Sequence, residues 1–165
     1  MKMTLFLAIG FMLVAAINPT EPADNAAGNP RTKHFRLDKN RLALDGYDPV
    51  SYFSGGPKKG LAKFAHEHEG VIYHFVSEKN RETFHANPAK YEPVWGGWCG
   101  HAMALRGEKV EINPECYKIV NGRNVLFFKS FYANALTNWE KEIKTTPEKT
   151  LMKKGDDFWA TILTK

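Results

Sequence analysis

Three side chains that can bind soft metal ions lie within five residues of one another. They are Cys99, His101 and Met103, in the pattern Cys-x-His-x-Met. Thiolate, imidazole and thioether groups suit copper far better than they suit magnesium or calcium. An extended backbone would direct all three to one face, whereas in a helix alternate residues diverge by about 200° and cannot share an ion. The pattern therefore predicts a copper site if this segment is extended.

Histidines that precede this segment could supply a further imidazole. His66 and His68 alternate along a predicted strand, so they share a face about 6–7 Å apart, and His74 lies on the strand that follows. The same alternation fits solvent-facing strand residues that bind nothing. We treat all three as additional candidate ligands.

The two cysteines allow other interpretations. In an oxidising compartment Cys99 and Cys116 would form a disulfide. The protein would then be a metal-free module that binds a small ligand or a partner in an aromatic pocket. A thiol-based redox enzyme is a third possibility, but the chain lacks a nucleophile, base and orienting group in a recognisable arrangement, so we expect no catalysis. The candidate pocket residues are Trp95, Trp98, Tyr47 and Asp48; the carboxylate of Asp48 is also suited to fixing its own turn.

The N-terminus has the features of a secretory signal. Lys2 gives a positive start, residues 3–16 are uncharged and almost wholly apolar, and small residues precede an expected cleavage after Ala16. The run is shorter than the roughly 20 apolar residues that span a bilayer. We therefore expect a periplasmic or secreted protein with no membrane span in its mature form.

Composition divides the remaining chain into a linker and one domain. Residues 17–34 are polar and aperiodic, which predicts a flexible linker, and residues 35–165 are enough for a single core. The net charge is +5, with basic residues scattered among acidic ones. Without a basic stripe, a nucleic-acid partner is not expected.

The pattern of this domain predicts an α+β fold, with a small antiparallel sheet of two hairpins packed with three to four helices. The hairpins turn at Gly70 and at Asn121-Gly122. Ser77 and Ser130 are the expected N-caps of two helices, the second with Phe131 on its apolar stripe, and Pro147 begins a third. The expected ranges are strands 61–69, 71–76, 117–120 and 125–128, an extended piece 50–53, and helices 78–86, 130–144 and from 147 onward.

Several separated motifs occur in a recognisable order. They are ALDGYDPVSYF at residues 43–53, GVIYHFVS at 70–77, NRETF at 80–84, NPAKY at 87–91, and Gly96-Gly97-Trp98-Cys99. In this order they resemble YHS-domain proteins of the exported, single-domain kind. The resemblance implies a small metal-binding module of the sort found beside heavy-metal and copper transport proteins. A metal-transport or redox protein is accordingly the expected partner.

The chain departs from the metal-binding form of that family, which carries cysteines at the positions of Val76 and Asn80. That thiolate pair cannot be carried over. Ligand types and resemblance together predict an exported copper-binding or heavy-metal-binding protein that uses Cys99, as a free thiol, with His101 and Met103.

Overall fold

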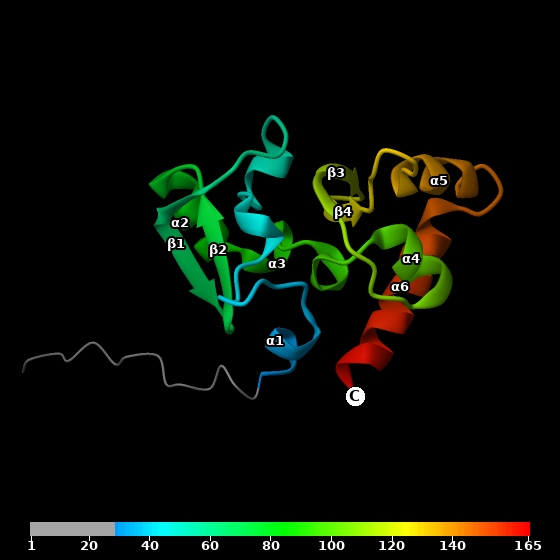
Figure 1. Ribbon diagram of the computed structural model, residues 1–165, viewed down its shortest axis with the longest axis horizontal. Coiled ribbons are helices and arrows are strands. Elements are labelled where there is room, and N and C mark those ends of the chain that lie inside the picture. The colour runs from blue at the N-terminus through cyan, green and yellow to red at the C-terminus, as the bar shows by residue number, and fades with distance from the viewer. Residues whose placement is uncertain (1–28) are drawn as a thin grey trace, which may run out of the picture.

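The structure is a computed structural model that describes residues 29–165 (Figure 1). The predicted signal, residues 1–16, and the linker up to residue 28 lie outside the described residues. The α+β class is confirmed. The elements are α1 (Pro30–His34), η2 (Leu44–Gly46), η3 (Ser51–Phe53), β1 (Leu61–His68), β2 (Val71–Phe75), α2 (Glu78–Ala86), α3 (Pro88–Tyr91), η4 (Val94–Gly97), α4 (Gly100–Arg106), β3 (Asn113–Val120), β4 (Arg123–Phe127), α5 (Ala135–Glu142) and α6 (Glu148–Leu163).

The two hairpins form two separate two-stranded sheets, β1–β2 and β3–β4. Both turns have two consecutive residues in the left-handed region, Glu69-Gly70 and Asn121-Gly122. Paired positive φ angles match the type I′ turn, whose twist suits an antiparallel hairpin. Each hairpin also carries an irregularity near the start of its first strand. The predicted strands are thus confirmed, although they do not join into one sheet.

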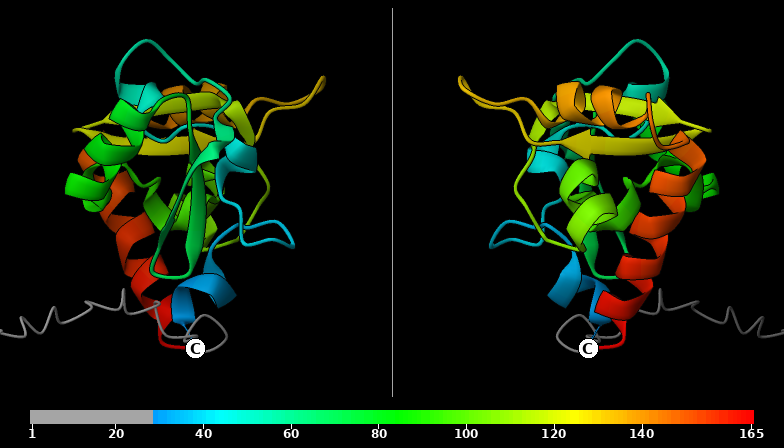
Figure 2. Two further views of the ribbon diagram at one scale, coloured as in Figure 1. Left: turned by 90° about the vertical axis from the view of Figure 1, so that its left-hand side faces the viewer. Right: turned by 90° about the vertical axis from the view of Figure 1, so that its right-hand side faces the viewer.

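The elements gather into two halves (Figures 1 and 2). In the first, α2 packs against the β1–β2 hairpin. In the second, α4 lies between the β3–β4 hairpin and the long helix α6, with α5 against β3. The η4 turn contacts both β4 and α6, so the loop that contains the two glycines Gly96-Gly97 lies where the second half comes together.

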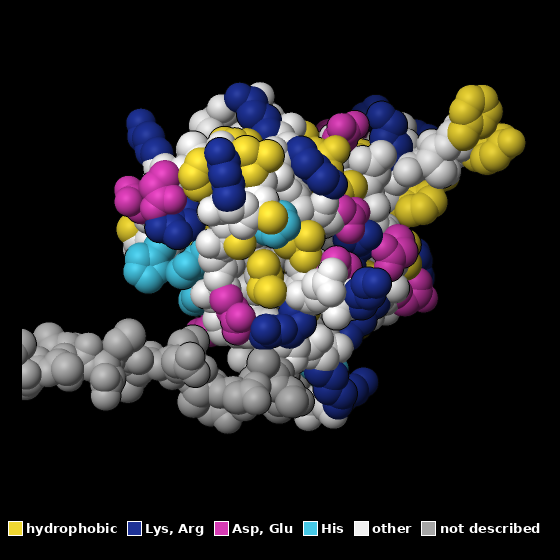
Figure 3. Space-filling model, turned by 60° about the vertical axis from the view of Figure 1, so that its left-hand side comes forward, with side chains coloured by type: hydrophobic (Ala, Val, Ile, Leu, Met, Phe, Trp, Pro, Cys, Tyr) yellow, Lys and Arg dark blue, Asp and Glu magenta, His cyan; other side chains and the backbone are white. Residues whose placement is uncertain are grey.

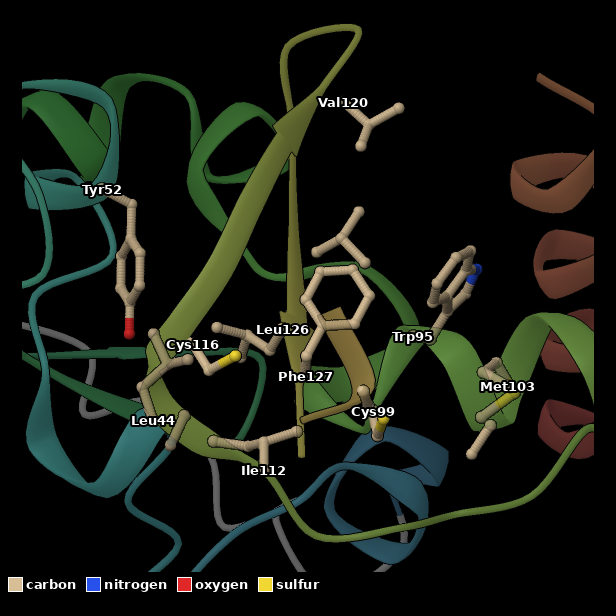
Figure 4. Packing of buried hydrophobic residues seen from close by; sticks show 14 of the residues in the cluster. Leu44, Tyr52, Trp95, Cys99, Met103, Ile112, Cys116, Val120, Leu126 and Phe127 are labelled. Carbon is tan, nitrogen blue, oxygen red and sulfur yellow. The ribbon is translucent and has the colours of Figure 1, made fainter. Parts of the chain in front are cut away.

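The indole of Trp95 occupies a slot made by glycines. A Cβ at Gly155 of α6 would lie 2.3 Å from Trp95 Cζ2, and one at Gly100 would lie 3.1 Å from Trp95 Cζ3. Such a Cβ cannot be accommodated without displacing the ring. Gly96 and Gly97, which follow Trp95 in the chain, both have positive φ. Figure 4 shows Trp95 beside the packed side chains of β4.

The predicted linker extends too far toward the domain. Residues 30–34 form α1, whose N-cap Asn29 accepts a hydrogen bond from the backbone amide of Arg31 at 2.9 Å. The guanidinium of Arg31 pairs with Glu92 and, at 3.1 Å, with Glu69. These polar contacts stabilise a short helix. The sequence pattern does not predict it, because its residues show no apolar periodicity.

Two further local predictions are wrong. Residues 51–53 form the 3-10 turn η3, because the carboxylate of Asp48 accepts hydrogen bonds from the amides of Val50 and Ser51 and curls the chain. The helix expected from Ser130 begins instead after Asn134, whose side chain caps α5. Ser130 closes a tight turn that leaves Phe131 93% exposed.

The helices predicted after Ser77 and from Pro147 are confirmed as α2 and α6, whereas α3 and α4 were not predicted. Ser77 caps α2, accepting a 3.2 Å hydrogen bond from the amide of Asn80, and Pro147 precedes α6. Trp139 of α5 is fully buried and its Nε1 donates to Glu148 of α6 at 2.7 Å. Between residues 29 and 165, none of the helices has the length and apolar character needed to cross a membrane.

Candidate functional site

The segment that carries Cys99, His101 and Met103 is helical. Cys99 is the N-cap of α4, and His101 and Met103 lie in its first turns. Successive residues of a helix are rotated by about 100°, so His101 faces away from the side shared by the other two. Cys99 is 1% exposed and Met103 is fully buried, both directed into the core (Figure 4). The three side chains therefore cannot coordinate one ion together.

Both cysteines are free and buried. Cys99 Sγ accepts a hydrogen bond from the amide of Phe128 at 3.3 Å, and Cys116 Sγ donates to Asn134 Oδ1 at 3.5 Å. Their sulfur atoms lie apart in Figure 4, so the structure does not contain the alternative disulfide. Burial raises the pKa of the Cys116 thiol, whereas redox catalysis uses exposed thiols of lowered pKa.

His101 is half-buried on the outer side of α4. Its Nε2 is buried and has no hydrogen-bond partner among the described residues, and burial lowers its pKa. A neutral imidazole in this setting behaves as a packed helix residue.

The strand histidines divide between the two faces of the first hairpin. His66 and His68 share a face, as predicted, with their strand partners Tyr73 and Val71. His74 pairs with Ala65 and lies on the opposite face, so it cannot join them. The imidazoles of His66 and His68 pack edge-on against Phe84 of α2, with ring centroids 6.1 and 6.0 Å away.

The helix that covers this face brings a histidine that sequence reasoning missed. His85 Nδ1 lies 3.4 Å from His66 Nε2, and the two rings are nearly perpendicular at 77°. His85 was visible in the sequence as the residue after Phe84, but nothing local linked it to His66. Only the docking of α2 on β1 makes the pair.

A hollow of about 230 Å³ opens beside this pair, and Glu82 and Arg81 complete its lining. Arg81 is held by an ion pair with Glu78 in the same helix. Burial, followed by the positive charge of neighbouring His85 and His68, lowers the pKa of His66, so its imidazole stays neutral at pH 7. Figure 3 shows histidine side chains gathered at this edge of the molecule.

The predicted pocket residues do not line a common pocket. Trp98 Nε1 donates to the carbonyl of His34 at 2.7 Å, and the hydroxyl of Tyr47 donates to Glu115 at 3.1 Å. Trp95 lines a cavity that is shared with α1 and α6, and the other three do not contribute to that cavity. Two segments that are distant in sequence form its other walls, and this is why the pattern around Trp95 did not reveal it.

Asp48 is a structural carboxylate. It is fully buried, and its Oδ1 accepts from the amide of Val50 at 2.8 Å. Its Oδ2 accepts from the amide of Val76 at 2.9 Å and from Asn80 Nδ2 at 2.7 Å. The expectation that Asp48 fixes its turn is confirmed, and the same side chain also ties that turn to the start of α2.

In residues 29–165 no group of three or more His, Cys, Asp or Glu side chains is arranged to hold a metal ion. The histidine pair therefore stands one protein ligand short of a three-ligand site.

No family model matches this chain, and neither the curated proteins nor the solved structures include a similar one. Function must accordingly be argued from the geometry.

Proposed function

We propose that this protein is an exported binder of a divalent transition metal, copper(II) in particular, and that His66 and His85 are its ligands. The observation that carries this proposal is the 3.4 Å separation of His66 Nε2 and His85 Nδ1. The proposed metal site is therefore not the predicted Cys99 segment but a pair of histidines, one on β1 and one on α2.

The separation is close to that of two ligands on one metal ion. In the square-planar geometry that copper(II) prefers, neighbouring imidazole nitrogens lie about 2.9 Å apart, so a small rotation of the exposed His85 ring would bring the pair to that spacing. A tetrahedral ion needs no such adjustment. Imidazole nitrogens bind first-row metals at about 2.0–2.1 Å, which places two tetrahedral ligands about 3.3–3.4 Å apart. The hollow beside the pair has room for an ion and for the water molecules that would complete its coordination. Glu82, one helical turn before His85, also lines it and supplies a carboxylate near the ion.

Protonation and charge at the pair are compatible with a bound cation. A histidine must lose its proton to bind a metal, and the lowered pKa of His66 means that this costs little at neutral pH. The guanidinium of Arg81 would oppose a cation, but its ion pair with Glu78 offsets that charge.

The ligand chemistry favours copper(II) over other divalent ions. Imidazole suits copper, zinc and nickel, and for a given nitrogen site affinity among first-row metals is highest for copper(II). The resemblance to exported YHS-domain proteins supports the same class of ligand. An ion held by two protein ligands at a partly exposed edge would exchange readily. Such a site suits a protein that buffers the metal or transfers it to a metal-transport or redox partner, and that catalyses no reaction itself.

Copper(II) titration of the purified, untagged protein tests this proposal, with heat and the copper electron paramagnetic resonance spectrum as readouts. We expect one ion per chain with nitrogen ligands. His66→Ala and His85→Ala should each weaken copper binding at least about tenfold. Mutation of a residue that only supports a ligand typically lowers metal affinity about 10-fold to 100-fold, and removal of the ligand itself should cost more.

The matched control is His74→Ala, which removes an imidazole from the opposite face of the same hairpin. It should leave copper affinity unchanged. Equal affinity in wild type, His66→Ala and His85→Ala would contradict the proposed site, and loss of binding in Cys99→Ala with native stability would return the metal to the Cys99 segment.

A further inference from the structure

A second cavity lies apart from the histidine pair, between α1, the stretch from α3 to η4, and α6. Its volume is about 290 Å³. Aromatic rings of Phe35, Trp95 and Trp159 contribute to its wall. Phe35 and Trp159 contact each other with centroids 5.7 Å apart. The two rings are tilted by 51° to each other, and aromatic surfaces of this kind are suited to an apolar ligand ring.

The carboxylates that line the cavity are already engaged. Asp156 accepts from Trp95 Nε1 at 2.9 Å and takes two hydrogen bonds from Arg123, at 2.7 and 2.9 Å. Glu92 Oε1 accepts from the guanidinium of Arg31 and from the hydroxyl of Tyr73, the latter at 2.6 Å. Little acceptor capacity is left for a cationic ligand.

One cation at the same cavity lacks a carboxylate partner. The ammonium of Lys90 lies over the ring of Tyr91 at 5.1 Å and forms no ion pair within residues 29–165. The guanidinium of Arg31, in contrast, is already paired with Glu92 and Glu69. The unpaired positive charge of Lys90 favours an anionic ligand.

We infer that this cavity binds a small organic anion with a planar apolar ring, of the aromatic carboxylate class. The ring would lie against Trp159 beside Phe35, and the carboxylate would face Lys90. If each non-hydrogen atom takes about 30 Å³, as a water molecule does, the cavity holds about ten of them. One aromatic ring with a carboxylate has about this many atoms. The site is independent of the proposed metal ligands.

Benzoate is the probe for this inference, titrated in the presence of a chelator so that no metal contributes. Binding is followed by tryptophan fluorescence and by calorimetry. We expect one saturable site. Benzamide, which has the same shape without the charge, should bind about tenfold more weakly or worse, because a charge-assisted hydrogen bond is lost.

Two variants locate the site. Ala89 is exposed and lines the cavity, so Ala89→Phe fills it, and Lys90→Ala removes the unpaired ammonium. Each should weaken benzoate binding about tenfold or more. The matched control is Lys149→Ala, an exposed lysine in the first turn of α6 that does not line the cavity, and it should bind as wild type does.

Three results would overturn the inference: no saturable benzoate binding, equal affinity for benzamide, or unchanged affinity in Ala89→Phe. None of them bears on copper binding by His66 and His85, so failure of one proposal leaves the other standing.

Discussion

The side-chain amide of Asn80 donates a 2.7 Å hydrogen bond to Asp48 Oδ2, and the backbone amide of Val76 donates to the same oxygen at 2.9 Å. In the resemblance to YHS-domain proteins that was predicted from the sequence, these are the two positions that carry cysteine in the metal-binding form. Here both are joined to a buried carboxylate. The place of a thiolate pair is thus taken by a hydrogen-bonded network with no free ligand.

Removal of that carboxylate should destabilise the fold strongly. Asp48→Ala leaves the amides of Val50 and Val76 and the side chain of Asn80 without an acceptor in a fully buried site. We expect a loss of about 3 kcal/mol or more in the free energy of unfolding, measured by urea titration. The control is Asp157→Ala, an exposed residue that pairs with Lys153 and should change stability by less than about 0.5 kcal/mol. Equal midpoints for the two variants would contradict the role of Asp48.

Gly155→Ala should also destabilise the protein, although alanine is the better helix former. The new Cβ would lie 2.3 Å from Trp95 Cζ2, so α6 and the indole must separate. Overpacking of this kind costs about 1–3 kcal/mol. Lys154→Ala, at the neighbouring exposed position, is the matched control and should have almost no effect. A thermal melt distinguishes the two, and a stabilised Gly155→Ala would show that the slot is not tight.

The state of the thiols can be tested directly by mass spectrometry. Both cysteines are free and almost inaccessible, so alkylation without reductant should label neither in the native protein and both after denaturation. A denatured protein that resists alkylation and is two protons lighter would establish the disulfide instead.

The contact between Asp156 and Arg123 should make stability depend on acid pH. Burial alone would raise the pKa of Asp156, but hydrogen bonds from Arg123 and Trp95 outweigh it and hold the pKa below its ordinary value. A carboxyl whose pKa is lower when folded stabilises the protein above its unfolded pKa of about 3.9, and this contribution is lost as pH falls through the folded value.

The test is Asp156→Asn. We expect it to lower stability at pH 7 by on the order of 1 kcal/mol, since the site is partly exposed. The difference from wild type should shrink below pH 4 as wild-type Asp156 takes up a proton. A difference that stays constant from pH 7 to pH 3 would assign the effect to packing and not to charge.

The parts of the fold that the sequence predicted are those with local causes. The two hairpins follow from Gly70 and Asn121-Gly122, which adopt the left-handed conformations that the turns require. The helix after Ser77 follows from a capping side chain next to the backbone it serves. Each of these signals acts within a few residues, so no knowledge of the tertiary structure is needed.

The arrangement of the candidate ligands was mispredicted where distant contacts decide it. The segment after Cys99 could be extended or helical by its own residues, and it is helical with Met103 inserted into the core. Likewise Ser130 and Asn134 are both competent caps, and the antiparallel bridge between Lys129 and Asn134 selects the second. The pairing of His66 with His85 depends wholly on how α2 docks against β1.

The slot that holds Trp95 also sets an order of events during synthesis. Gly155, which faces the indole, and Asp156, which accepts its N–H, both belong to α6, about sixty residues later in the chain. A nascent polypeptide that ends before α6 can contain both hairpins, α2 and α4, but it lacks one wall of the slot and the acceptor of the indole N–H. The final packing of the second half therefore cannot be completed until α6 has been synthesised.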